Sequence, residues 1–252
     1  MPESWTFVLV AIVGLASMIY GVSKTALPGS GILAGTLLAA ALGPAAASGF
    51  ALPLLLVGDV IALSRYRRGA NWRIILGLLP WVLVGLIGAA ALFAFLDRTS
   101  LSRILGVLIL ASVLLEVRRR RQGEHAADSS TPLSRQVAVG FYGTLAGMTT
   151  MTANAGGAAM TLYLLKIRVP MLAFLGTSSW FWAIVNITKV PFALGLGTIT
   201  TESLRADLWF LPFLLLGAGL GVWLYPRMSQ TFFSAAVLSL SGVAAVWLII
   251  HG

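Results

Sequence analysis

The sequence predicts an all-α polytopic membrane protein made of two homologous five-segment halves. Of its 252 residues, 58% are hydrophobic and only 10% are charged, and the mean hydropathy is +0.93. A soluble domain contains about a quarter charged residues, so this chain has too few polar side chains to cover a water-soluble globule. The apolar residues form ten runs, and glycine and proline recur at matching places in the two halves.

Glycine, proline and basic residues end each apolar run and so define ten expected segments. The second and the seventh are short. At 1.5 Å per residue the second covers about 18 Å of a hydrocarbon core that is about 30 Å thick. We therefore expect broken or short helices where segments one and two meet and where segments six and seven meet. The expected segments are residues 5–22, 32–43, 47–63, 74–96, 101–117, 137–148, 158–165, 171–196, 208–225 and 232–250.

Two polar, glycine-rich stretches interrupt the apolar runs at equivalent places. They are residues 21–31 (GVSKTALPGSG) and 147–157 (GMTTMTANAGG), which lie 126 residues apart. In membrane transporters, a matched pair of broken segments in two halves of the chain points to the substrate site.

Glycine and proline positions indicate an internal duplication, because these residues mark backbone breaks and close approaches. We expect a first transmembrane repeat at residues 1–121, a cytoplasmic linker at 122–134 and a second repeat at 135–252. At an offset of 126, Gly14, Gly21, Gly31 and Pro44 align with Gly140, Gly147, Gly157 and Pro170; at an offset of 132, Pro80, Gly85 and Thr99 align with Pro212, Gly217 and Thr231.

The distribution of basic residues predicts the orientation. If all ten segments cross and the N-terminus is outside, twelve basic residues fall in cytoplasmic loops and three fall outside. If the second and seventh segments are re-entrant, only eight segments cross. Ten basic residues then lie in cytoplasmic loops and five lie outside. The positive-inside rule favours ten crossings, which gives each half an odd number and inverts the second half relative to the first. The eight-crossing arrangement stays open.

Three ionisable residues fall within apolar segments or breaks, namely Lys24, Asp59 and Lys189. A charge at the bilayer centre costs about 2.5–3.5 kcal/mol on insertion scales, so such residues line a cavity or pair with each other. A structural ion pair, or a lysine that reaches an interface, also explains each of them. Asn186 lies on one helix face with Lys189 and Ser178. Asp59 fits a counter-ion, a proton-coupling group or a ligand residue.

The two breaks supply uncharged hydrogen-bond donors. Helices that restart after a break point their N-terminal N–H groups at it, and these positive dipole ends favour anions. Lys24 and Lys189 are expected at a similar depth in the bilayer, so the electric field at the breaks favours a small oxyanion. Tight helix packing is the other explanation of the glycines. The donors are Ser23, Thr25 and Ser30 in the first break and Thr149, Thr150, Thr152 and Asn154 in the second.

Enzyme function is not expected. The only histidines are His125 and His251, there is no cysteine, and no serine–histidine pair, metal-ligand cluster or phosphate-binding loop is present in the sequence. We expect no metal and no cofactor. The basic residues lie between apolar segments, which argues against nucleic-acid binding. The expected partners are the lipid bilayer and a small anionic substrate, and the sequence is compatible with a homo-oligomer.

Several short motifs together resemble the TauE/SafE family of membrane permeases over nearly the whole chain. The family often has proline after its Asn-Ala-Gly-Gly run, where this chain has Ala158. The motifs are GVSKTALPG at 21–29, Leu52-Pro53, Gly58-Asp59 and RYRR at 65–68 in the first half, and TANAGG at 152–157, LYLL at 162–165, GTSSWFW at 176–182 and VNITKVP at 185–191 in the second.

This resemblance implies a multi-pass permease of the bacterial inner (plasma) membrane. It would export a small sulfur oxyanion (sulfite, sulfoacetate or a related organosulfonate) by secondary transport, with Asp59 as a coupling group or counter-ion. A cation-coupled importer of another small solute and a non-transporting membrane scaffold protein stay open as alternatives. The candidate substrate-binding residues lie within the matching motifs and are Ser23, Lys24, Thr25, Asn154, Ser178, Asn186 and Lys189.

Overall fold

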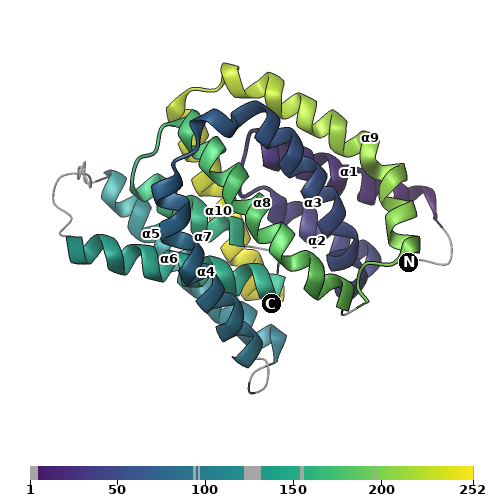
Figure 1. Cartoon of the computed structure of the whole chain (residues 1–252), viewed down its shortest axis with the longest axis horizontal. Helices are drawn as coiled ribbons and strands as arrows, with labels where there is room; N and C mark the ends of the chain where they lie inside the picture. The colour runs from purple at the N-terminus through teal and green to yellow at the C-terminus, as the bar shows by residue number, and fades with distance from the viewer. Residues whose placement is uncertain are drawn as a thin grey trace. The chain divides into compact units, whose positions relative to one another are not determined.

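The computed structural model describes residues 5–92, 95, 97–121, 132–153, 156–195 and 197–251. All regular secondary structure in this part of the chain is helical (Figure 1). The short 3-10 helices η1 and η2 follow α3 and α9. The helices are α1 (Phe7–Thr25), α2 (Gly31–Leu42), α3 (Pro44–Tyr66), η1 (Arg67–Gly69), α4 (Trp72–Leu92), α5 (Arg98–Arg121), α6 (Pro132–Ala153), α7 (Gly156–Lys166), α8 (Met171–Gly195), α9 (Thr201–Leu224), η2 (Tyr225–Arg227) and α10 (Gln230–His251).

The ten α-helices fall on the ten predicted segments, and the predicted all-α membrane class is confirmed. Seven helices in the described residues are long and apolar enough to cross a membrane. The two short helices are the predicted ones, with 12 residues in α2 and 11 in α7. The largest difference is the start of α9, at Thr201 instead of 208. The side chains of Thr200 and Ser203 form a capping box there, which starts the helix two turns earlier.

The chain forms two compact units, and each combines segments from both halves of the sequence. Unit 1 contains residues 1–70 and 175–229, and therefore α1 to α3, most of α8, and α9. Unit 2 contains residues 71–174 and 230–252, and therefore α4 to α7, the start of α8, and α10. The predicted boundary at the linker 122–134 separates the two sequence repeats and not the two compact units. It stays a prediction.

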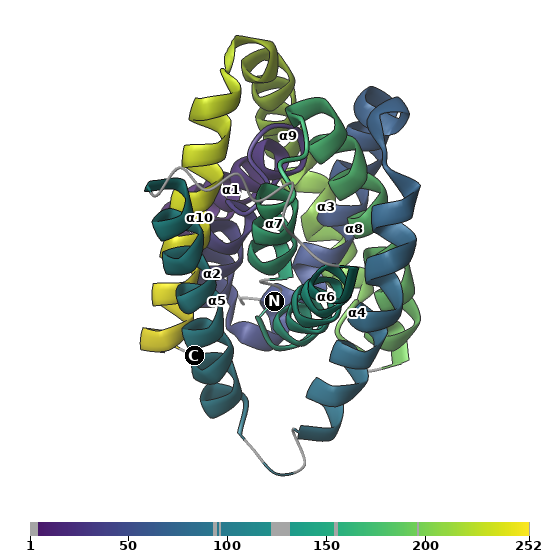
Figure 2. The same cartoon turned by 90° about the vertical axis from the view of Figure 1, so that its left-hand side faces the viewer.

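Within unit 1, α1 lies next to α9 (Figure 1 and Figure 2). Trp5, just before α1, packs its ring on Phe210 with 5.3 Å between ring centroids. Near the other end of α1, Thr25 lies against Gly221 of α9. Residue numbers increase in the same direction along both helices, so α1 and α9 are parallel.

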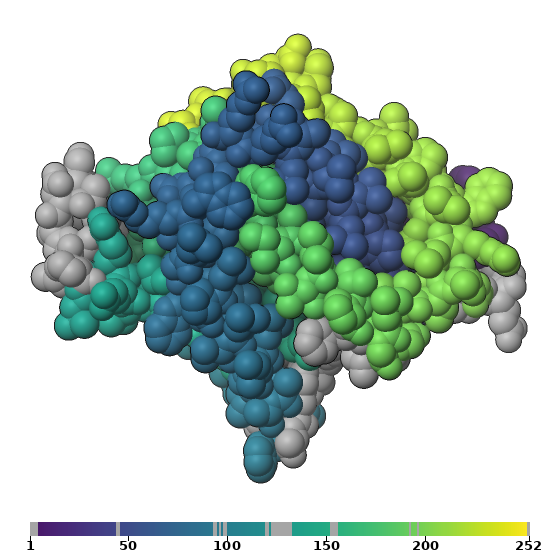
Figure 3. Space-filling view, viewed as in Figure 1, coloured from purple at the N-terminus to yellow at the C-terminus, as the bar shows by residue number. Residues whose placement is uncertain are grey.

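α3 is parallel to the same two helices. The ring of Phe50 meets Phe210 at a centroid distance of 5.8 Å, and the ring of Tyr66 meets Tyr225 at 5.2 Å. Figure 3 shows the side chains of α3, α8 and α9 packed side by side over one face of unit 1. Because α1 and α3 run the same way, the chain has to return between them.

The short helix α2 makes this return. Its first residue, Gly31, lies against Ser23, and Gly35, one turn later, lies against the hydroxyl of Tyr20. α2 therefore runs antiparallel to α1 over about 18 Å. If α2 were re-entrant, α1 and α3 would be antiparallel, so the observed geometry favours a crossing by α2.

The closest helix contacts of the two units match each other. In unit 1, a Cβ on Gly21 of α1 would collide with the carbonyl oxygen of Leu214 on α9. In unit 2, a Cβ on Gly147 of α6 would collide with the carbonyl oxygen of Val82 on α4. Gly147 follows Gly21 by 126 residues, and Leu214 follows Val82 by 132 residues, which are the two offsets found in the sequence.

The reciprocal contacts match as well. Gly217 lies against the carbonyl of Met18 in unit 1, and Gly85 lies against the carbonyl of Thr144 in unit 2. Equivalent helices also run in opposite directions within a unit, because α3 is antiparallel to α8 and α5 is antiparallel to α10. The inverted duplication stays a prediction, and these contacts agree with it.

The glycine contacts give a matched stability test. We expect Gly217→Ala and Gly85→Ala each to destabilise the protein by about 1–3 kcal/mol, because the added methyl group meets the backbone of the partner helix. Gly219→Ala is the control, since a Cβ there meets open space and alanine favours the helix by about 1 kcal/mol. Unfolding in detergent measures the effect. Equal stability of the Gly217 and Gly219 variants would show that the close approach is absent.

Candidate functional site

Three predicted site residues meet inside unit 1, one from each of three helices. Lys24 of α1 donates from Nζ to Asp59 Oδ1 at 2.5 Å, and Asn186 of α8 donates from Nδ2 to Asp59 Oδ2 at 2.7 Å. The side chains of Lys24 and Asp59 are 11% and 2% exposed. Each oxygen of the α3 carboxylate therefore has its own donor. We call Lys24, Asp59 and Asn186 the polar triad.

The Gly58-Asp59 pair creates the local geometry of the triad. A Cβ on Gly58 would lie 2.9 Å from Cγ of Lys24, so the lysine stem passes directly over this glycine. The ammonium group then reaches the carboxylate of the next residue. Because the sequence provides a gap and an acceptor side by side, a long cationic side chain can cross α3 without disturbing the helix.

Unit 1 has one strongly basic end, which lies where α3 and α9 finish. The parallel course of these helices brings their C-terminal ends together, and the tyrosine rings there are in contact. Such basic segments mark the cytoplasmic side of membrane proteins. The exposed arginines of this basic end are Arg65, Arg67, Arg68 and Arg227.

The triad lies well inside the span. Asp59 precedes Tyr66 by seven residues, which is about 10 Å along α3. Asn186 follows Gly176 by ten residues, or about 15 Å along α8, and Gly176 lies against the backbone of Tyr66 at the basic end. In a core about 30 Å thick, the triad is thus located between the basic end and the middle of the bilayer.

Lys189 lies one helical turn beyond Asn186 on α8, further from the basic end. Its side chain is partly buried, and its ammonium group is close enough to Lys24 for the two charges to repel. The region therefore contains two ammonium groups and one carboxylate. Their formal charges leave an excess of one positive charge.

Thr25 is fully buried and holds the first break together. Its hydroxyl lies 2.9 Å from the carbonyl of Gly21 and 3.1 Å from the carbonyl of Ala218, and its own carbonyl accepts a hydrogen bond from the hydroxyl of Tyr66 at 2.8 Å. Its hydroxyl hydrogen is thus directed at backbone carbonyls. These contacts fasten α1 to α9 and α3 beside the triad.

The other candidate residues lie at different distances from the triad. Ser23 is partly buried and contacts Gly31, where α2 begins. Ser178 is buried on α8, eight residues or about 12 Å nearer the basic end than Asn186. Asn154 lies outside the described residues. Of the predicted residues, the structure thus brings Lys24, Asp59 and Asn186 together, and it places Thr25 and Ser178 in the same unit.

Asp207 is a buried carboxyl that the sequence reasoning missed. The ninth segment was expected to begin at 208, which placed this residue in a loop. It lies in the second turn of α9 and is 5% exposed, and in the described structure neither carboxylate oxygen has a hydrogen-bond partner. The signal that could have revealed it is the capping sequence from Thr200 to Ser203.

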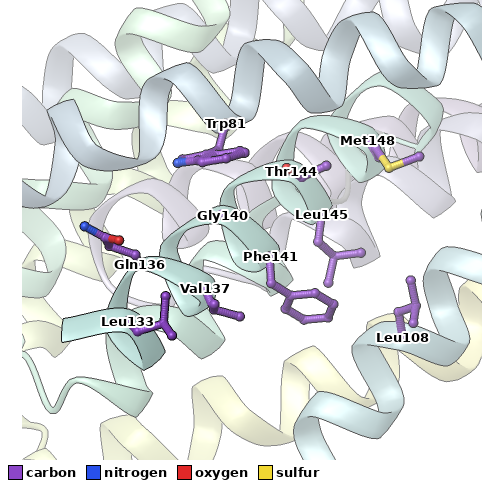
Figure 4. Close-up of a pocket in the computed structure, with 10 residues that line it drawn as sticks. All are labelled: Trp81, Leu108, Leu133, Gln136, Val137, Gly140, Phe141, Thr144, Leu145 and Met148. Atoms are coloured by element: carbon purple, nitrogen blue, oxygen red, sulfur yellow. The ribbon is translucent and has the colours of Figure 1, made fainter. Parts of the chain in front are cut away.

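Unit 2 contains an apolar groove (Figure 4). It has a volume of about 600 Å³ and is formed by α6 with Trp81 of α4 and Leu108 of α5. Gln136 and Thr144 are the polar side chains among the residues that line it. No candidate substrate-binding residue lines this groove, and its composition suits hydrocarbon chains instead of an anion.

Comparison with known proteins identifies the family. The family model for the sulfite exporters TauE/SafE matches residues 7–248. The chain belongs to the TauE/SafE family. No curated protein and no solved structure matches it. As a TauE/SafE protein it is a multi-pass membrane transporter and not an enzyme, and the polar triad is its buried charged centre.

Loss of the ion pair in the triad should lower the free energy of unfolding of this TauE/SafE protein. We expect Lys24→Met to destabilise it by about 3–5 kcal/mol, because the buried Asp59 carboxylate loses its cation. Combining Lys24→Met with Asp59→Asn should cost clearly less than the sum of the single changes. Unfolding in detergent measures the four members of this cycle. Additive costs would show that the two side chains do not interact.

Proposed function

We propose that this TauE/SafE protein exports a small sulfur oxyanion by secondary transport across the bacterial inner (plasma) membrane. Sulfite, sulfoacetate and related organosulfonates are the substrate class. The observation that carries the proposal is the excess positive charge around Lys24, Asp59 and Lys189 inside the span. A buried excess charge is unfavourable in a bilayer, and an anion with one negative charge balances it.

The donors in this region match the oxygens of such an anion. An ammonium group has three N–H donors and a carboxamide has two. Lys24 and Asn186 each direct one donor at Asp59, which leaves further N–H groups for a ligand. We propose Lys24, Asn186 and Lys189 as direct ligands. Ser23, Ser178 and Asn154 stay proposed ligands from the family motifs, and Thr25 supports the break.

Asp59 is the proposed counter-ion of Lys24 when no substrate is bound. Its carboxylate takes the same donors that an oxyanion needs, so substrate and Asp59 compete for Lys24 and Asn186. An anion that displaces Asp59 loosens the contacts that α3 makes with α1 and α8. Substrate binding thereby changes the contacts between these helices. Alternating access requires such a coupling between substrate binding and helix movement.

The membrane potential provides a driving force for this export. With the basic end on the cytoplasmic side, as the positive-inside rule indicates, the anion leaves a compartment that is electrically negative. Outward movement is favoured by about 2.3 kcal/mol per charge for each 100 mV. A monoanion can therefore be exported without a coupled cation.

The test is efflux of sulfite and of sulfoacetate from proteoliposomes, with and without an imposed inside-negative potential. We expect wild-type efflux that the potential accelerates. Lys189→Met should raise the substrate concentration needed for half-maximal efflux by about tenfold to a hundredfold, because a charge-assisted contact is worth about 1.5–3 kcal/mol. Lys166→Met, at the end of α7 in unit 2, is the matched control and should behave like wild type.

Other results would favour the alternatives. No efflux of either anion contradicts the proposal. Anion binding that is unchanged in Lys189→Met points to a cation-coupled importer of another solute. Full function in Asn186→Ala points to a scaffold protein, because only a transporter requires the amide at the buried site.

A further inference from the structure

Asp207 is a buried acid without a hydrogen-bond partner among the described residues. Its side chain is 5% exposed, and both of its carboxylate oxygens are shielded from solvent and make no hydrogen bond in the described structure. Almost all buried polar groups in proteins have such a partner, so an exception calls for a physical explanation. In a membrane-spanning segment, an isolated acid is by default a functional feature.

The neighbouring residues confirm that Asp207 faces the interior of unit 1. It belongs to the buried face of α9, together with Ser203 and Phe210. Phe210, one turn later, packs on Trp5 and on Phe50 of α3. Ser203, one turn earlier, uses its hydroxyl in the helix cap with Thr200, where it donates at 2.8 Å and accepts at 2.9 Å.

Among the described residues of unit 1, no charged side chain, Lys189 of α8 included, interacts electrostatically with this carboxyl. The stretches that pack near it, residues 5–19 up to the middle of α1 and residues 44–58 of α3, contain no ionisable side chain, and neither does α2. The closest ones on those helices are Tyr20, Lys24 and Asp59, which lie nearer the basic end. On α9 itself, Glu202 and Arg205 are both exposed.

An ionised carboxylate in these surroundings is strongly unfavourable. Burying it without a cation or a donor costs several kcal/mol, whereas adding one proton removes the charge. We propose that Asp207 is a proton-binding site, occupied by a proton in the conformation described here. The proton comes from water, binds one carboxylate oxygen and leaves the same way, so the step needs no other reactant.

The position of Asp207 assigns the side from which the proton enters. It lies about 9 Å along α9 from Thr201, at the end of unit 1 opposite to the basic end. Ionisation requires water, and water reaches the carboxyl when the first turns of α9 separate from α1 and α3. Proton binding therefore stabilises the closed packing at this end. Only the assignment of this end to the cell exterior, and the link with transport, rest on the proposed function.

Infrared spectroscopy of the full-length protein in lipid nanodiscs tests the proton site directly. We expect a carbonyl band of a protonated carboxylic acid at neutral pH, which Asp207→Asn removes. Glu202→Gln, an exposed acid in the first turn of α9, is the matched control and should keep the band. Absence of the band from the wild type, or its persistence in Asp207→Asn, would overturn the proposal.

A second measurement covers the case in which the asparagine variant does not fold. Carbon-13 labelling of aspartate shifts the band only if an aspartic acid carries the proton, and the chain has four, at positions 59, 97, 128 and 207. We expect the shifted band in the wild type and in Asp59→Asn. An unshifted band, or its loss in Asp59→Asn, would assign the proton to another residue and reject Asp207.

The link with transport has its own readout. In proteoliposomes, sulfite efflux should depend on the pH outside, and this dependence should disappear in Asp207→Asn but not in Glu202→Gln. A dependence that survives in Asp207→Asn would reject the link. If no form of the protein moves sulfite, the proposed substrate is wrong, whereas the infrared result still decides whether Asp207 holds a proton.

Discussion

The packing of α1, α3 and α8 in unit 1 depends on the carboxylate of Asp59. It accepts one hydrogen bond from Lys24 and one from Asn186, and so joins α1, α3 and α8 inside the hydrocarbon region. Lipid offers no replacement donor, hence all three helices have to arrive together for the charge to be tolerated. The lysine stem passes closely over Gly58, and this brings its ammonium group to the carboxylate. A substrate anion that takes over these donors acts on three helices at once.

The glycine contacts make such an arrangement possible. Gly21 and Gly217 bring α1 and α9 within backbone distance, and this fixes the end of α1 from which Lys24 extends. Without a hydrophobic force between helices in lipid, close van der Waals packing of small residues has to hold the pair together. In unit 2, the matching contact of Gly85 brings α4 and α6 together in the same way. The same packing element thus serves both units, and in the described part of the chain the charged centre belongs to unit 1.

The sequence predicted most of the fold, because bilayer helices follow apolar runs and end at glycine, proline and basic residues. It also selected Lys24, Asp59, Asn186 and Lys189, since charged and amide groups stand out against apolar segments. Which helices pair could not be read from it: α1 contacts α9, about 200 residues away, through glycines that reveal closeness but not the partner. Asp207 was missed because a helix start was set by hydropathy, whereas the capping box of Thr200 and Ser203 decides it.

Asp59 and Asp207 show two different ways to keep an acid inside a membrane. The carboxylate of Asp59 accepts hydrogen bonds from two donors, whereas Asp207 has no hydrogen-bond partner among the described residues, which favours its neutral form. The two sites also lie toward opposite ends of the parallel helices α1, α3 and α9. Both sites involve α1 and α3. In the proposed mechanism the packing of these two helices responds to the competition for Lys24 at Asp59 and to a proton at Asp207. An anion and a proton can therefore influence each other's binding without contact, by biasing one shared helix arrangement.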